Sequence, residues 1–595
     1  MAAKRFRIDN QDALFELMAE APDISSEGES DIEFEPEGLP ETSSGEDSPS
    51  EDECNDDSGE EGLSQEDVCE AYWDEVLPGA DPYSNGVEFS VRNPGGRSLP
   101  LRNSPPIVYF NLFLTMDLLI HIVRETNKYA RDLLAAKAEW IQIHPHSRLR
   151  RWMNGGLTVA LLKKWIGLSI NMGIIRKKNV KMYWDLTHPS QATPFFGQVM
   201  PLWQYLIVTR MIHLNDNATA KARGEEGFDP WHKVRPVLDS LNRAFKKYYV
   251  PRQVLSIDES MIGMKNRVAY IQYMPNKRHA RFGIKKFEVC DSSNSYILHV
   301  DLYAGRDKTT GCEKGFVYNK VMSLLKSCDL LNKGYHLMTD NYYTSVGLAE
   351  DLLLTTTLLT GTVRVNSKGL PPEITRAKLQ PGGSKYLRKG GLLACAFREK
   401  KSHRKPVLLL STASLASDVL VHTRCGQSAI KPQIILDYNK GMGGVDVSDR
   451  KIYEFAAERP THRYWSKIWR NLIDVSIMNA YELYKINTEH SKLLSRHSFV
   501  VDIIEALCLS QEGTSSEHSA ATPLLAPSSK EHGFAILPAK KERDCAICSD
   551  RSKPGGRKRS RHWCPGCNVG IHERCYPLLV HSTPCNIDPD DSSVG

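Results

Sequence analysis

QVLSID at residues 253–258 begins the part of the chain that decides the fold, and KKFEVCD at 285–291 and SYILHVDLYAG at 295–305 continue it. Each segment is a short apolar run, and the turn-like DSSNS separates the last two, so all three predict antiparallel strands. Apolar residues at helical spacing follow in FVYNKVMSLLKSCDLL at 316–331, and YHLMTDN at 335–341 predicts a fourth strand. The predicted order is therefore three strands, a helix and a strand.

This order is that of a ribonuclease-H-like core, in which acids at the ends of the first and fourth strands meet and a later helix supplies a third acid. Asp258 and Asp340 end the first and fourth runs. The third candidate is Asp446, in DYNKGMGGVDVSDRK at 437–451, where Gly441, Gly443 and Gly444 permit a tight turn. Three converging carboxylates repel unless divalent cations lie between them. Two Mg²⁺ ions held by such acids can activate a water or a 3′-hydroxyl against a phosphodiester.

Spacing and topology alone do not single out these three acids. A strand-end aspartate often caps the following turn or helix, so each of the three also has a purely structural explanation. Other acids lie close in the sequence and remain candidates: Glu259, Asp291, Asp301, Asp437 and Asp449.

Six of the fourteen cysteines lie between Cys545 and Cys585, in a pattern typical of zinc binding. The candidate ligands form four pairs: Cys545 and Cys548, Cys564 and Cys567, His572 and Cys575, and His581 and Cys585. A gap of two residues lets both members of a pair reach one tetrahedral zinc ion. The pattern predicts two structural zinc sites, interleaved first pair with third and second with fourth, as in a cross-brace finger. A single zinc site without the last pair is the alternative.

Charge is distributed unevenly along the 595 residues. Residues 1–75 hold 26 acidic and 3 basic residues, whereas the rest of the chain holds 73 basic and 46 acidic residues. We expect a disordered acidic region at 1–90, because it has too few large apolar groups to offset its chain entropy. The basic remainder indicates a polyanionic partner such as nucleic acid. Basic residues in the finger indicate DNA contact, nuclear import or both: Arg557, Lys558, Arg559 and Arg561.

The remaining segments give coarser information. Apolar spacing predicts a mainly helical region at 107–250, and the Ser-, Thr- and Pro-rich segment at 511–534 predicts a linker before the finger. No apolar stretch predicts a membrane span. The start MAAKRFRIDN has no apolar run behind its basic residues, so we expect an intracellular protein without structural disulfides.

Three blocks closely resemble the catalytic blocks of the piggyBac family of DNA transposases: SIDESM around Asp258, LMTDNYYTS around Asp340 and DYNKGMGGVDVSD around Asp446. Other blocks agree in order, among them WIGLSINMG at 165–173, HKVRPVLDSLN at 232–242 and YMPNKRHARFGIK at 273–285. The resemblance covers about residues 107–585, including the cysteine-rich segment.

The resemblance implies a multidomain α/β architecture. It comprises a ribonuclease-H-like catalytic domain at 251–365 and 433–456, a β-rich insertion at 366–432, a helical dimerisation and DNA-binding domain at 107–250 and 457–510, and a zinc finger at 540–588. Trp465 matches a tryptophan that the family places after the third acid, where it supports the hairpin and flipped-base geometry at transposon ends. Simple core packing is the alternative for Trp465.

The resemblance also implies a reaction. Asp258, Asp340 and Asp446 would hold two Mg²⁺ or Mn²⁺ ions, water would nick a transposon end, and the new 3′-hydroxyl would form a hairpin before the ends join a TTAA target. A nuclear homodimer acting on terminal inverted repeats is the implied assembly, with the finger binding repeat DNA. Two other functions stay open: a domesticated DNA-binding or chromatin protein that no longer transposes, and a finger that reads histone tails. A nuclease that cuts DNA without strand transfer is intermediate between a transposase and a pure binding protein.

Overall fold

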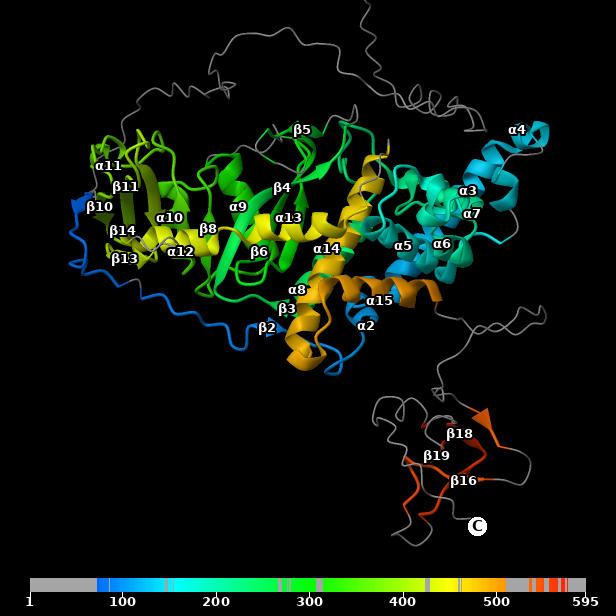
Figure 1. Ribbon diagram of the computed structural model, residues 1–595. Coiled ribbons are helices and arrows are strands. Elements are labelled where there is room, and N and C mark those ends of the chain that lie inside the picture. The colour runs from blue at the N-terminus through cyan, green and yellow to red at the C-terminus, as the bar shows by residue number, and fades with distance from the viewer. Residues whose placement is uncertain are drawn as a thin grey trace, which may run out of the picture. The chain divides into compact units, whose positions relative to one another are not determined.

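The computed structural model (Figure 1) describes residues 72–84, 86–144, 148–152, 155–265, 270–275, 277, 280–305, 314–422, 428–457, 461, 463–509, 535–537, 542–550, 556–564, 569–572 and 575. The predicted linker at 511–534 and the predicted zinc ligands Cys567, His581 and Cys585 lie outside these residues, as does most of the acidic region. Within the described ranges, no helix is both long enough and apolar enough to cross a membrane.

Five strands form the centre of a mixed ten-stranded sheet. They are β4 (Val254–Gly263), β6 (Phe282–Asp291), β7 (Ile297–Leu302), β8 (His336–Thr339) and β9 (Leu358–Thr362). Their spatial order is β7-β6-β4-β8-β9. β6 pairs antiparallel with β4 and β7, whereas β8 pairs parallel with β4 and β9. The strands and the helix predicted between 253 and 341 are confirmed, with β4 and β6 longer than their apolar runs.

Helices cover this part of the sheet, which explains its apolar composition (Figure 1). Eight consecutive residues of β4 are buried, as expected for a strand with both faces covered. α8 (Arg235–Tyr248) and α9 (Phe316–Ser327) contact β7, and α10 (Val346–Leu354) contacts β9. The parallel pairs β4–β8 and β8–β9 require such crossover connections, which α9 and α10 provide.

The residues expected to form the β-rich insertion extend the same sheet. β12 (Val407–Ser411) pairs with β9, β11 (Leu392–Phe397) with β12, and β10 (Ser384–Lys389) with β11, all antiparallel. Two further elements complete this region: the short helix α11 (Pro372–Thr375) and the hairpin of β13 (Asp418–His422) and β14 (Ser428–Pro432). The small three-residue β5 (Ile271–Tyr273) pairs with β6 at the opposite edge of the sheet.

The structure differs from the predicted acidic region of 1–90 at its C-terminal end. β1 (Asp74–Glu75) pairs with β10, and β2 (Gly95–Gly96) pairs with β3 (Tyr249–Val250). Asp81 forms an ion pair with Arg388, and both side chains are almost fully buried. A buried ion pair and strand pairing hold this segment to the body, although its composition resembles that of the acidic residues before it.

Helices from two distant parts of the chain pack together. α15 contacts α5 and α2, and α14 contacts α2 and α8. The helices of this region are α2 (Pro106–Phe110), α3 (Met116–Ala136), α4 (Ala138–Ile143), α5 (Val159–Ile174), α6 (Pro194–Val199), α7 (Leu202–Met211), α14 (Tyr464–Asn487) and α15 (Arg496–Leu509). Short 3₁₀ turns at Arg148–Trp152, Val180–Tyr183, Pro189–Gln191, Asn217–Thr219 and His490–Lys492 connect them.

The cysteine-rich segment contains short strands. They are β15 (Ala535–Ile536), β16 (Arg543–Asp544), β17 (Arg559–Ser560), β18 (His562–Cys564) and β19 (Val569–Gly570). Its described apolar cluster is centred on Cys545, Ile571 and Cys575. Among the described residues of this segment the buried apolar set is small, and small domains of this kind are often stabilised by a structural metal.

Candidate active site and metal centre

Asp258 and Asp340 lie level with each other on neighbouring parallel strands. The register pairs Val254 with His336 and Ser256 with Met338. Continuing it by two residues places Asp340, which directly follows β8, beside Asp258. Asp258 lies inside β4 and not at its end as predicted. Neighbouring strands are about 4.8 Å apart, so the two side chains lie close together on the sheet. Their backbone environments help to orient them, because Asp258 Oδ1 accepts from the Glu259 N–H at 2.8 Å and Asp340 Oδ1 from the Tyr342 N–H at 2.9 Å.

The third predicted acid comes from a helix. Asp446 lies in the first turn of α13 (Gly444–Phe455), which follows α12 (Gln433–Gly441) and contacts β4 and β6. The first-turn position favours a carboxylate, because the helix dipole is positive there. Asp446 is 70% exposed, so its carboxylate projects from the body of the protein.

The glycines before Asp446 have a different role from the one predicted. Gly443 has an ordinary φ of −72°, so it does not require the conformational freedom of glycine. A Cβ on Gly444 would instead lie 2.2 Å from Ser256 Oγ, and a Cβ on Gly441 would lie 2.7 Å from Met338 Cγ. These two glycines let the helices approach β4 and β8 closely, which brings Asp446 near the strands that bear the other two acids.

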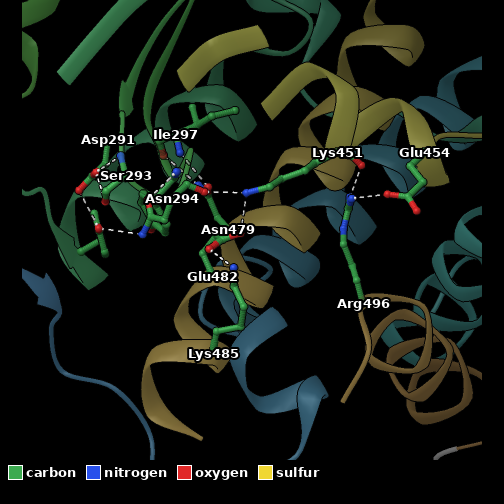
Figure 2. A network of polar contacts seen from close by, with 12 residues as sticks. Asp291, Ser293, Asn294, Ile297, Lys451, Glu454, Asn479, Glu482, Lys485 and Arg496 are labelled. Carbon is green, nitrogen blue, oxygen red and sulfur yellow. Dashed lines mark hydrogen bonds and ion pairs between the residues drawn. The ribbon is translucent and has the colours of Figure 1, made fainter. Parts of the chain in front are cut away.

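A polar network fixes α13 against the neighbouring elements (Figure 2). Lys451 donates to the Asn294 carbonyl at 2.7 Å and to Glu482 on α14 at 2.9 Å. Arg496, the first residue of α15, donates to the Lys451 carbonyl and to Glu454. Three elements therefore hold the helix that carries Asp446: the turn before β7, helix α14 and helix α15.

Lys277 lies between two of the predicted metal ligands. Its ammonium is 3.8 Å from Asp258 Oδ2 and 3.5 Å from Asp446 Oδ1. Burial acts to lower the pKa of Lys277, but the acids around it, Asp258 and Asp446 foremost, raise it above its ordinary value. Sequence reasoning did not identify this lysine, because it is one of several basic residues in YMPNKRHARFGIK and its spacing does not distinguish it.

The electrostatics of the acids fit a cation site. Burial raises the pKa of Asp258 well above its ordinary value; Lys277 opposes the shift, and Glu259 and Asp340 add to it. Burial likewise raises the pKa of Asp340, with Glu259 contributing. The charges of all three predicted acids reach Tyr438 on α12 and raise its pKa, after the larger effect of burial. Buried carboxylates whose pKa is raised, as at Asp258 and Asp340, have the chemistry that a hard divalent cation would satisfy.

The other candidate acids have partners that explain them structurally. Asp291 accepts hydrogen bonds from Tyr249 and Ser293, and Asp301 pairs with Lys320. Asp437 accepts from Gln433. Two acids support the site from nearby: Glu259 accepts from Tyr343 and pairs with Lys285 at 3.6 Å, and Asp449 accepts from Ser260 at 2.5 Å.

The finger brings together one complete set of predicted zinc ligands. Donor atoms of Cys545, Cys548, His572 and Cys575 all lie within 4.8 Å of one another. His572 Nδ1 faces Cys548 Sγ at 3.2 Å, while its Nε2 lies 3.0 Å from the Arg559 carbonyl, which fixes the ring as outer partners of metal ligands do. Burial opposes ionisation of Cys545, but backbone N–H groups lower its pKa to about 6. Three thiols and an imidazole fit a closed tetrahedral Zn²⁺ site.

This set joins the first and third ligand pairs, as the interleaved arrangement requires. The backbone of Cys564 lies in β18, and its side chain is outside the described residues together with Cys567, His581 and Cys585. The second predicted site therefore stays a prediction.

The predicted DNA-contact residues lie in two different settings. All four basic residues of the finger are exposed: Arg557, Lys558, Arg559 and Arg561. Two of them pair with Asp544 Oδ1, Arg557 Nε at 2.9 Å and Arg559 Nε at 3.5 Å. Exposed pairs of this kind are weak and leave the guanidinium groups able to contact another anion. Trp465 differs from the DNA-contact prediction: it is 4% exposed and packs in the core beside His213, at 5.2 Å between ring centroids. Core packing, the alternative, describes Trp465 in this structure.

Comparisons with known proteins agree with this architecture. Residues 105–481 match the family described as Transposase IS4. The chain is 23% identical over 396 residues to the human PiggyBac transposable element-derived protein 3, an alignment that covers 64% of this chain and 62% of the relative, so it spans less than two thirds of that protein. It is 21% identical over 439 residues to the human PiggyBac transposable element-derived protein 5, covering 70% and 79%.

A solved structure shares the fold. It is a piggyBac transposase synaptic complex with hairpin DNA, which has a TM-score of 0.58 and 24% sequence identity and covers 70% of this chain and 83% of that chain.

Proposed function

The chain belongs to the Transposase IS4 family, in its piggyBac type, and we propose that it cuts and joins DNA phosphodiester bonds as a cut-and-paste transposase. The observation that carries the proposal is the Lys277 ammonium lying between Asp258 and Asp446, with Asp340 beside Asp258 in the continued register of β4 and β8. The strand order β7-β6-β4-β8-β9 supports a ribonuclease-H-like catalytic core.

Asp258, Asp340 and Asp446 would hold the divalent ions. When bound, Mg²⁺ or Mn²⁺ would supply activation of the attacking oxygen and charge stabilisation at the phosphorus. The protein would contribute the geometry: two acids from adjacent strands and one from a helix that Lys451 and Arg496 anchor. Glu259 and Asp449 would stay outside the ligand set, since Tyr343 and Ser260 engage them.

The proposed reaction is hydrolysis followed by transesterification. Water would cut one strand at a transposon end, the freed 3′-hydroxyl would attack the opposite strand to form a hairpin, and the opened ends would join a TTAA target. The protein would act in the nucleus as a homodimer, with a zinc-bound finger on the terminal repeats. Exposed Arg557, Lys558, Arg559 and Arg561 would contact the phosphates there.

The test is a cleavage assay with purified full-length protein, Mg²⁺ and labelled DNA that carries candidate terminal repeats flanked by TTAA. We expect hairpin ends and joined products from the wild type and none from Asp340→Asn, which keeps the side-chain volume. Asp437→Asn is the matched control, because it changes a nearby acid that is engaged with Gln433. Binding without cleavage by the wild type on these substrates would favour the domesticated DNA-binding protein, and equal cleavage by Asp340→Asn would contradict the assigned site.

A further inference from the structure

The predicted metal ligands have one basic side chain in their midst. Among the described residues, Lys277 is the one basic residue in ion-pair contact with any of Asp258, Asp340 and Asp446. Its ammonium lies 3.8 Å from Asp258 Oδ2 and 3.5 Å from Asp446 Oδ1. One positive charge therefore lies where a strand and a helix bring two of the three acids together.

The contact of Lys277 is loose compared with other lysine pairs around the central sheet. Lys286 lies 2.5 Å from Glu288, and Lys320 lies 2.5 Å from Asp301. Both distances at Lys277, 3.5 and 3.8 Å, exceed the length of about 2.7–2.9 Å that is typical of a charge-assisted hydrogen bond. Charge, and not a fixed hydrogen-bond geometry, holds this ammonium, so a cation of higher charge can displace it.

The position of Lys277 in the chain lets its side chain move. The lysine follows β5 in the connection to β6, and the Met274 N–H closes the base of this connection by donating to the Arg281 carbonyl at 2.7 Å. The Lys277 side chain is 21% exposed. Because the lysine belongs to no strand or helix, its ammonium can leave the acids by side-chain rotation while β4 and α13 keep their places.

A divalent ion and the ammonium compete for the same place. Mg²⁺ binds carboxylate oxygens at about 2.0–2.1 Å, and the two oxygens nearest the ammonium belong to predicted ligands, Asp258 and Asp446. The Asp258 side chain is only 12% exposed, so water screens little of the charge there. Two cations a few ångströms apart in such a site repel each other strongly. Binding of the ion therefore requires the ammonium to leave.

We propose that Lys277 holds the place of a divalent cation in the metal-free protein, and that the ion must displace its ammonium to bind Asp258 and Asp446. The inference rests on the proposed function, because it takes these acids as metal ligands. Lys277 then has two effects. It neutralises two carboxylates before the metal arrives, and it raises the concentration of divalent ion at which the site fills.

Calorimetric titration of the full-length protein with Mn²⁺ tests the displacement without DNA and without catalysis. Lys277→Met should bind Mn²⁺ more tightly by about five-fold or more, since one partly exposed ion pair contributes up to about this factor. Lys277→Arg keeps the charge and should keep the wild-type affinity. Lys285→Met is the matched control. Lys285 is similarly buried, but its ion pair, at 3.6 Å, is with Glu259, which is outside the predicted ligand set. This variant should also stay close to the wild-type affinity.

Asp340→Asn supplies the background of the titration, because it removes one predicted ligand. Mn²⁺ binding that depends on Asp340 but is equal in Lys277→Met and the wild type would overturn the inference and leave the proposed function in place. Equal gains in Lys277→Met and Lys285→Met would also overturn it, because a general loss of positive charge would explain them. If no variant binds Mn²⁺ better than Asp340→Asn, the metal site of the proposed function fails and the inference fails with it.

Urea unfolding without added divalent ions tests the pairing itself. Lys277→Met should lower the unfolding midpoint of the wild type, because it leaves the two carboxylates without their cation. The same substitution should leave the midpoint of Asp258→Asn/Asp446→Asn unchanged, since that variant has no carboxylate at either contact. An equal fall in both backgrounds would overturn the inference, because lost packing alone would then explain the effect.

Discussion

The pair of Lys286 and Glu288 offers a sharp test of the architecture beneath the active site. Both side chains are completely buried on β6, with the ammonium 2.5 Å from Glu288 Oε1. Glu288 Oε2 has no hydrogen-bond partner, and the charge of Asp449 on α13 reaches both members of the pair. Lys286 thus neutralises two buried carboxylates.

Lys286→Met should destabilise the protein by about 3–5 kcal/mol at neutral pH, because removal of one partner leaves a buried charge uncompensated. The upper part of this range applies because neither side chain contacts solvent and Asp449 loses its cation as well. Lys286→Met/Glu288→Met should recover part of the loss, since apolar replacement of a whole buried pair is often neutral, whereas Asp449 still lacks its cation. Lys320→Met, which breaks the partly exposed pair with Asp301, should cost less than about 1 kcal/mol.

Urea unfolding followed by tryptophan fluorescence measures these differences, and Trp231 reports on this region because it donates to the Leu302 carbonyl on β7. Burial already raises the pKa of Glu288 and Asp449, and loss of Lys286 should raise both further. An acid whose folded pKa lies above its unfolded value destabilises the fold as pH rises from the unfolded to the folded pKa. The penalty of Lys286→Met should therefore be small near pH 4 and grow toward neutrality. A loss below about 1 kcal/mol at pH 7, or a double variant no better than the single, would refute this reasoning.

Three further predictions follow from single contacts. Gly444→Ala places a Cβ 2.2 Å from Ser256 Oγ, so α13 must shift. We expect the free energy of unfolding, measured with urea, to fall by about 1–3 kcal/mol, and cleavage that depends on Asp446 to be lost. Cys548→Ser should lower the zinc content by one ion per chain, measured by mass spectrometry of the metal, and unchanged zinc would contradict the four-ligand site. Asp81→Asn leaves the buried Arg388 without its carboxylate. We therefore expect the free energy of unfolding to fall by about 1–3 kcal/mol and proteolysis between residues 72 and 100 to become faster.

Local patterns predicted the central strands well. The runs that became β4, β6, β7 and β8 are apolar and bounded by turn residues, and these properties depend only on near neighbours in the sequence. The end of the acidic region was harder to place. Asp74 and Glu75 have the composition of the acidic residues before them, and only pairing with β10, far along the chain, gives them a strand conformation.

The candidate active site likewise combines features that the sequence predicted with features that only packing decided. Position in the predicted elements and the family blocks together indicated Asp258, Asp340 and Asp446, although Asp258 lies inside β4 and not at its end, and Lys277 carried no distinguishing signal. The sequence shows the glycines before Asp446 but does not show why glycine is needed there. The close approach of Gly444 to Ser256 exists only after the helix packs on the sheet. For Trp465 the family motif suggested a DNA contact, whereas packing in the structure buries the side chain.

The sequence by itself determined the candidate zinc-ligand types and the order of the core elements, because these depend on residue identity and on spacing of a few positions, and it offered the three acids as candidates. Tertiary structure alone decided which ligand pairs meet and how the register sets Asp340 beside Asp258. Electrostatic energies depend on distances in space, which spacing along the chain does not encode.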